Sequence, residues 1–78
     1  MTRIGPVSWK KFDKFLKKHA CYPTRQKGSH QAYRKEGLRR PIIIPKKKEL
    51  EPWLIHQTLR SLQIAYEEFL KFMGKSRK

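Results

Sequence analysis

Three histidines are the side chains of this sequence best suited to acid–base chemistry, and one of them has a distinctive setting. His30 follows a possible turn glycine in the run Arg25-Gln26-Lys27-Gly28-Ser29-His30. A neutral imidazole can act as a general base, and cations beside it can hold a phosphate. This combination could remove the proton of an RNA 2′-hydroxyl while Arg25 and Lys27 hold the backbone. By spacing alone, an ordinary surface histidine on a strand remains the simpler interpretation.

The other candidates for chemistry are weaker. His19 is expected at the C-terminal end of a helix, where positive charge is favourable, and His56 is expected as a partly exposed helix residue. The histidines lie far apart in the sequence, and no carboxylate clusters with them, so we expect no metal site and no cofactor. Ser29 and His30 are expected on one strand with opposite orientations, which argues against a serine–histidine pair.

The elements that must position His30 begin with a helix and a hairpin. Apolar residues recur at helical spacing over residues 8–20, with lysines on the other faces, and Ser8 is the expected N-cap. The aromatic residues of this helix are expected in the core. Two short strands are expected over residues 22–27 and 29–34. Gly28 lies between them, and glycine tolerates the positive φ of a tight turn.

A third strand and two helices complete the expected fold. The strand is predicted over residues 39–45, with the isoleucines of 42–44 buried on both faces for part of its length. Helices are predicted over 52–64 and 66–73. Helices on one side of an antiparallel sheet give a two-layer α+β domain in the order α-β-β-β-α with a short C-terminal helix. A lead-in over residues 1–7 and a mobile basic tail over 75–78 are expected at the ends.

Charge narrows the class of partner. The 78 residues include 20 Lys and Arg against 6 Asp and Glu, a net charge of +14. Residues 1–48 hold 15 basic and 2 acidic side chains, or +13, whereas residues 49–78 carry only +1. Such a field favours a polyanion, which can be nucleic acid, an acidic protein or an anionic membrane, and nucleic acid is the favoured one. Nothing approaches the length of a membrane span. Cys21, the one cysteine, is expected as a buried core residue in a reducing cytoplasm.

Five segments, in order and at compatible spacings, resemble the HicA mRNA interferase toxins of bacterial and archaeal toxin–antitoxin pairs. They are Trp9-Lys10-Lys11-Phe12-Asp13-Lys14-Phe15-Leu16, Arg25-Gln26-Lys27-Gly28-Ser29-His30, Ile42-Ile43-Ile44-Pro45, Thr58-Leu59-Arg60-Ser61-Leu62 and Glu67-Glu68-Phe69-Leu70. The resemblance implies one HicA-like domain over residues 1–74, with a fold like the double-stranded RNA-binding domain.

The resemblance also implies metal-independent RNA cleavage in which the motif histidine, here His30, is essential. Gly28 and Ser29 belong to the same motif and are assigned a positioning role. The implied partner is a HicB antitoxin that covers the active site, giving a hetero-oligomer. The side chains expected to bind RNA phosphates are Arg25, Lys27, Arg34, Arg39, Arg40, Lys46, Lys47 and Lys48.

Two departures from the family pattern matter for function. Many relatives carry Gly-Phe after the first helix, where this chain has Ala20-Cys21-Tyr22. Many also carry a histidine soon after the strand-ending proline. Here Lys46 or Lys47 would have to replace that histidine, or the activity would be weaker. A non-catalytic module that binds double-stranded RNA, and a chain that acts mainly as half of a protein complex, are the alternative functions.

Overall fold

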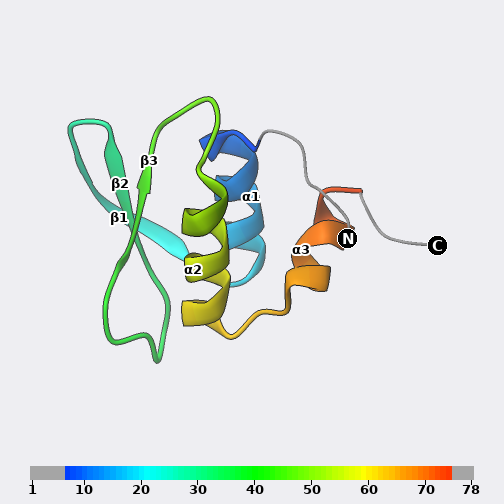
Figure 1. The fold of residues 1–78 in the computed structure, drawn as a ribbon. Coiled ribbons are helices and arrows are strands. Elements are labelled where there is room, and N and C mark those ends of the chain that lie inside the picture. Colours follow the sequence, from blue (N-terminus) through cyan, green and yellow to red (C-terminus); the bar gives the residue numbers. More distant parts are fainter. Residues whose placement is uncertain (1–6, 75–78) are drawn as a thin grey trace.

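The computed structural model describes residues 7–74, which form six elements of secondary structure (Figure 1). The elements are α1 (Trp9–Lys18), β1 (Tyr22–Lys27), β2 (His30–Arg34), β3 (Ile42–Pro45), α2 (Pro52–Leu62) and α3 (Tyr66–Phe72). The fold class is α+β, as predicted, with an order consistent with the double-stranded RNA-binding domain. Most of the predicted lead-in and the whole predicted tail, residues 1–6 and 75–78, lie outside the described residues.

Helix α1 has the cap and the buried face that its sequence predicts. The Ser8 side chain accepts a hydrogen bond from the backbone N–H of Lys11 at 3.2 Å, which satisfies one free donor of the first turn. Phe12 and Phe15 are fully buried on one face. The helix ends earlier than predicted, at Lys18, because Ala20 adopts a left-handed φ of 67°.

The three strands form one antiparallel sheet in the order β1-β2-β3. A two-residue turn, Gly28-Ser29, joins the first two strands, and Gly28 has the predicted positive φ of 60°. The first turn position of a type II′ hairpin requires this conformation. The predicted start of the second strand at Ser29 is therefore wrong, because Ser29 is part of the turn and β2 begins at His30.

The third strand is shorter than predicted, and it is buried on one face only. Arg39 and Arg40 lie in a bend, and β3 begins at Ile42, after Pro41. Ile42 and Ile44 are buried, but Ile43 is 45% exposed, so the prediction of burial on both faces is wrong. The reason is the layering, since the helices cover only one face of this antiparallel sheet.

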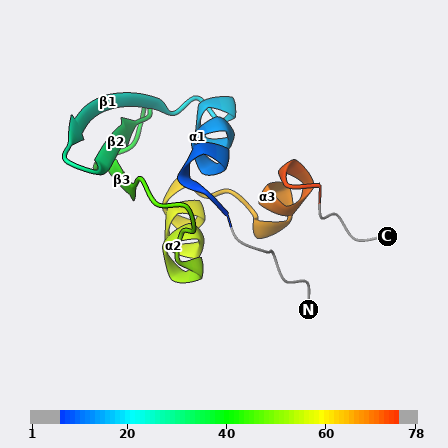
Figure 2. The same cartoon turned by 90° about the horizontal axis from the view of Figure 1, so that it is seen from above.

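The helices lie on one side of the sheet, and α3 lies farthest from it (Figures 1 and 2). Ile55, Leu59 and Leu62 are buried along α2, as their spacing predicts. This helix ends at Leu62 rather than at the predicted residue 64, because Gln63 adopts a left-handed φ of 59°. Helix α3 likewise ends one residue before the prediction, at Phe72.

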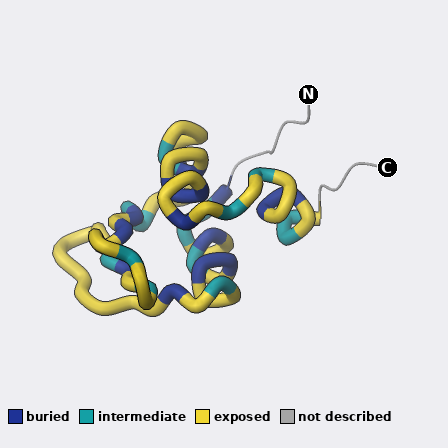
Figure 3. The backbone as a smooth tube through the Cα atoms, turned by 90° about the horizontal axis from the view of Figure 1, so that it is seen from below, coloured by how far each residue is buried: buried dark blue, intermediate teal, exposed yellow. Residues whose placement is uncertain are grey.

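Aromatic contacts join α3 to α1. The Phe69 ring meets Phe12 and Phe15 edge-on, with ring centroids 5.4 and 4.9 Å apart. Edge-on aromatic pairs add to the stability that burial already provides. The core therefore lies among the helices and the inner face of the sheet, whereas the β1–β2 hairpin is largely exposed (Figure 3).

One hydrogen bond ties the sheet to the first helix. Tyr33 of β2 is fully buried, and its hydroxyl donates to the carboxylate of Asp13 on α1. Asp13 also pairs with Lys17 at 3.1 Å. The only aspartate of the sequence thus accepts a hydrogen bond from the buried Tyr33 hydroxyl. This bond holds the inner face of β2 against α1.

Candidate active site

The outer face of the sheet, away from the helices, brings together three of the residues that the sequence singled out: His30, Arg25 and Lys27. Side chains alternate along a strand, so His30 and Ala32 share the face opposite to Tyr33. The strand register places Lys27 directly across from His30 on one side, and Arg25 and Ile43 on either side of Ala32. These five residues line an open hollow of about 400 Å³, called here the His30 hollow.

His30 is the first residue of β2, directly after the turn, and its side chain is exposed to solvent. A directly opposed pair in an antiparallel sheet brings its Cβ atoms to about 5 Å, so Lys27 and His30 can reach the same ligand group. Arg25 lies farther along β1 in the same hollow. An imidazole and two cationic side chains therefore line one open hollow.

The turn before His30 is held by backbone and amide contacts. The Gly28 carbonyl accepts a hydrogen bond from the Gln26 side chain at 3.2 Å, and the Ser29 carbonyl accepts one from the Lys46 N–H at 2.7 Å. The Ser29 contact ties the turn to the residue that follows β3. Gly28 and Ser29, which the sequence assigned a positioning role, thus form the turn directly before β2 and His30.

The lysines after β3 do not enter the His30 hollow. The Lys46 ammonium contacts the Gln26 side chain and lies 4.8 Å from the centre of the Trp9 ring. Lys47 is 4.0 Å from the Glu51 carboxylate. Lys48 is exposed in the same loop. Neither Lys46 nor Lys47 is thus placed to replace the histidine that many relatives carry after this strand.

The three remaining arginines of the predicted RNA contacts lie at the borders of this face. Arg34 ends β2, paired with Tyr22 and on the same side as His30 by alternation. Arg39 and Arg40 precede β3 and line a second depression, between β3 and α2. Of the predicted RNA contacts, only Arg25 and Lys27 therefore line the hollow of His30 among residues 7–74. The other three arginines lie at the borders of the outer face.

Sequence reasoning missed two exposed apolar residues near these cations. Ile43 lines both depressions, and Trp53, at the start of α2, is 61% exposed. A signal for Trp53 was present, because it precedes the buried series Ile55, Leu59 and Leu62 by two residues and so falls off that face of the helix.

Two groups with shifted pKa values lie in the interior, apart from the His30 hollow. Burial raises the pKa of the Tyr33 phenol well above its usual range, and Asp13 reinforces the shift through its hydrogen bond and its charge. Burial likewise raises the pKa of the Cys21 thiol, against a smaller lowering by Lys35. The thiolate is the reactive form, so Cys21 is a core residue, as predicted, and a poor nucleophile.

No three histidine, cysteine or acidic side chains within residues 7–74 are grouped in a way that would hold a metal ion. In the same part of the chain, none of the helices is long and apolar enough to cross a membrane.

Comparison with known proteins gives one match. Residues 9–64 match the model of a family described as the HicA toxin of bacterial toxin–antitoxin systems. The matched range runs from the start of α1 to just beyond α2, and it includes the whole sheet and the turn before His30. No curated protein and no solved structure matches the chain.

Proposed function

The chain belongs to the HicA toxin family of bacterial toxin–antitoxin systems, and on this premise we propose that it is a metal-independent endoribonuclease that cleaves mRNA with His30. The observation that carries the proposal is the placement of His30. It is exposed on the open face of the sheet, directly across from Lys27 and in one hollow with Arg25. This placement supports the proposal, because a general base needs its imidazole beside cations that can hold the phosphate.

In the proposed reaction, the His30 imidazole takes the proton of an RNA 2′-hydroxyl. The 2′-oxygen then forms a bond to the adjacent phosphorus, and the bond from phosphorus to the 5′-oxygen breaks. The 5′-oxygen leaves with a proton taken from solvent, and His30 releases its proton to solvent, so the products are a 2′,3′-cyclic phosphate and a 5′-hydroxyl. Lys27 and Arg25 stabilise the negative charge that builds up on the phosphate oxygens.

Cleavage of purified RNA in the presence of a chelator tests the proposal. A positioned general base contributes about 10²- to 10⁴-fold, so His30→Ala should slow cleavage by that factor. The matched control is His56→Ala, which removes an exposed histidine from α2, outside the His30 hollow. Cleavage by His30→Ala at the wild-type rate would refute the role of His30.

Substrate chemistry gives a second check on the same mechanism. RNA with a 2′-fluoro group at every position lacks the hydroxyl proton that His30 is proposed to take, so it should bind and remain intact. Fragments of ordinary RNA should end in a cyclic phosphate. Cleavage of the 2′-fluoro strand would show that the nucleophile is not the 2′-oxygen.

A non-catalytic RNA-binding module is the second candidate, and one observation favours it. Beside His30, the only ionisable side chains that line the His30 hollow within residues 7–74 are Arg25 and Lys27, so no ordinary general acid accompanies the base. Such a module would bind RNA with a steep salt dependence and leave it uncut. A gel of RNA incubated with excess protein separates the two functions.

The proposed partner is a HicB-type antitoxin that covers the outer face of the sheet and blocks the His30 hollow. A chain with a net charge of +14 associates fastest with an acidic partner. The test is co-expression with the neighbouring reading frame in the genome. A short acidic product that co-purifies and stops cleavage would support the pair, and one that leaves cleavage unchanged would contradict it. The site of action proposed for this pair is the cytoplasm, where mRNA is translated.

A further inference from the structure

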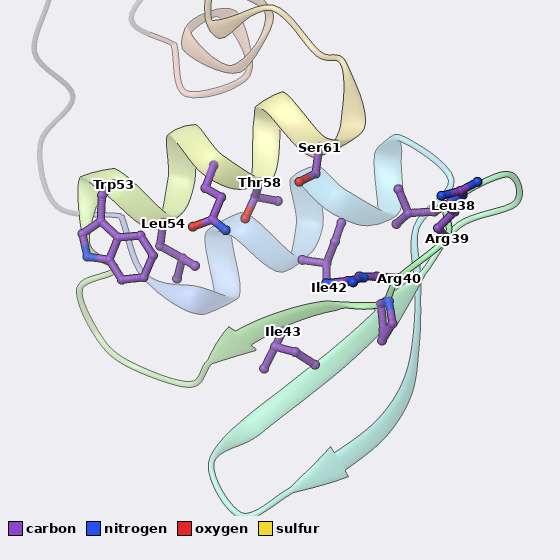
Figure 4. A pocket seen from close by; sticks show the side chains of 11 residues that line it. Leu38, Arg39, Arg40, Ile42, Ile43, Trp53, Leu54, Thr58 and Ser61 are labelled. Atoms are coloured by element: carbon purple, nitrogen blue, oxygen red, sulfur yellow. The ribbon is translucent and has the colours of Figure 1, made fainter.

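A groove of about 610 Å³ runs between α2 on one side and β3, with the segment just before it, on the other (Figure 4). We call it the Trp53 groove. Trp53 and Leu54 stand at one end of it, and Arg39 and Arg40 stand at the other. Ile43 contributes to the wall on the sheet side. The groove therefore has an aromatic end and a cationic end.

The chemistry of the lining selects for an anionic ligand with a flat apolar part. Among residues 7–74, no acidic side chain lines the groove, whereas two arginines do. Guanidinium groups match the geometry of phosphate oxygens and bind them through paired hydrogen bonds. Trp53 keeps 61% of its surface exposed, which leaves room for a planar group to stack on it. Unpaired nucleic acid bases stack on aromatic side chains in this way.

The Trp53 groove and the His30 hollow share one lining residue. Ile43 lines both of them, since it lies on β3 with its side chain exposed between the two. A nucleic acid strand held at His30 by Lys27 and Arg25 can therefore cross Ile43 and enter the groove without meeting an acidic lining residue.

We propose that the Trp53 groove is a second subsite for single-stranded RNA, in which one base stacks on Trp53 while Arg39 and Arg40 hold phosphates. This proposal rests on the proposed function for the identity of the ligand as RNA. Single-stranded RNA is required because a base must leave its pair to present a free face to an aromatic side chain. The subsite would select the nucleotides that flank the bond placed at His30.

An acidic protein segment that adds a strand to the free edge of β3 is the competing occupant. The edge of β3 has few backbone groups that could pair with such a strand. The strand has four residues, and Pro45 at its end and Pro41 just before it lack N–H donors. The exposed indole of Trp53 and the two arginines therefore fit an RNA ligand better than an added peptide strand.

Binding of 2′-fluoro single-stranded RNA, which His30 cannot cleave, tests the subsite directly. Stacking of a base contributes about 1–3 kcal/mol, so Trp53→Ala should weaken affinity about 5- to 150-fold. Trp53→Phe keeps a smaller ring and should lose less. The matched control is Tyr22→Ala, since Tyr22 is also exposed, at 52%, but lies on β1 outside both depressions. Tyr22→Ala should bind like the wild type.

Two further measurements locate the contact. In a Trp9→Phe background, Trp53 is the only indole, and the same RNA should quench its fluorescence. Arg39→Gln and Arg40→Gln should each lower the slope of log affinity against log salt by about 1, because each removes one phosphate contact. Far-UV circular dichroism of every variant shows that the fold is retained.

The outcomes separate this proposal from the catalytic one. If folded Trp53→Ala binds the RNA as tightly as the wild type, the subsite is refuted and the role of His30 stands. If His30→Ala still cleaves RNA, the catalytic proposal fails, while weaker binding by Trp53→Ala still supports the subsite. If Trp53→Ala binds RNA normally but no longer captures a HicB-type antitoxin, the groove holds protein and the RNA proposal is overturned.

Discussion

The two faces of β2 hold opposite kinds of residue only a few positions apart. On the inner face, Tyr33 is fully buried, and its hydroxyl donates a hydrogen bond to the Asp13 carboxylate. On the outer face, His30 is exposed to solvent, and it shares a hollow with two cationic side chains. Alternation along one short strand thus separates a core residue from the residue proposed to carry out the chemistry. Substitutions on the inner face should therefore change folding, and those on the outer face should change function.

The largest expected contrast is between Phe15 and His30. Phe15→Ala removes a fully buried ring and should lower the free energy of unfolding by about 3–5 kcal/mol. His30→Ala should change it by less than about 0.5 kcal/mol, because the side chain is exposed. Urea unfolding followed by circular dichroism measures both. A large loss of stability in His30→Ala would break the separation between the two faces.

The next effect concerns the buried hydrogen bond of the inner face. Tyr33→Phe should cost about 1.5–3 kcal/mol, because the Asp13 carboxylate loses its hydroxyl donor. The raised pKa of Tyr33 also sets a pH dependence. The stability that depends on the protonated phenol is complete below the unfolded value of about 10 and is lost as pH rises above it.

Tyr33→Phe should accordingly remove the part of the alkaline loss of stability that the phenol causes. Thermal melts between pH 8 and pH 11 for both proteins measure this. Equal alkaline slopes would mean that the Tyr33 phenol does not set the pH dependence. Cleavage at neutral pH should be the same in the two proteins, since Tyr33 faces away from the His30 hollow.

The smallest effect tests how the turn holds His30. Gly28→Ala forces an alanine into a left-handed φ and should cost about 1–2 kcal/mol, although a Cβ there meets nothing within 4 Å. Gly37→Ala is the matched control, with a φ of 90° and the same open surroundings. Both variants should lose comparable stability. Only Gly28→Ala should slow RNA cleavage, and equal cleavage by the two variants would deny the positioning role.

Much of this arrangement follows from local signals in the sequence. The Ser8 cap, the buried face of α1 and the turn at Gly28 each depend on neighbouring residues, so the existence of these elements was predictable. The same holds for the position of His30 just past a hairpin turn. Its neighbourhood with Arg25 and Lys27 follows from a two-residue turn, since Lys27 then pairs with His30.

The features that the sequence could not specify depend on which face the helices cover. Three consecutive isoleucines carry no alternation, so the exposure of Ile43 became evident only once the layers were known. Lys46 begins a run of three lysines typical of a solvated loop, yet its ammonium lies over the Trp9 ring. Trp53 lines one groove with Arg39 and Arg40, and this grouping joins segments that are distant in the chain.

Two backbone hydrogen bonds fasten the beginning of the described chain to the segment before α2. Leu50 N–H donates to the Val7 carbonyl at 2.7 Å, and Trp9 N–H donates to the Lys47 carbonyl at 3.0 Å. Val7 is itself buried, and it lies outside the 9–64 range that matches the family, as does the buried Phe69. A fragment trimmed to the matched range would lose both residues from the core. The buried core therefore extends beyond the range matched by the family on both sides, and useful truncations should keep both flanks.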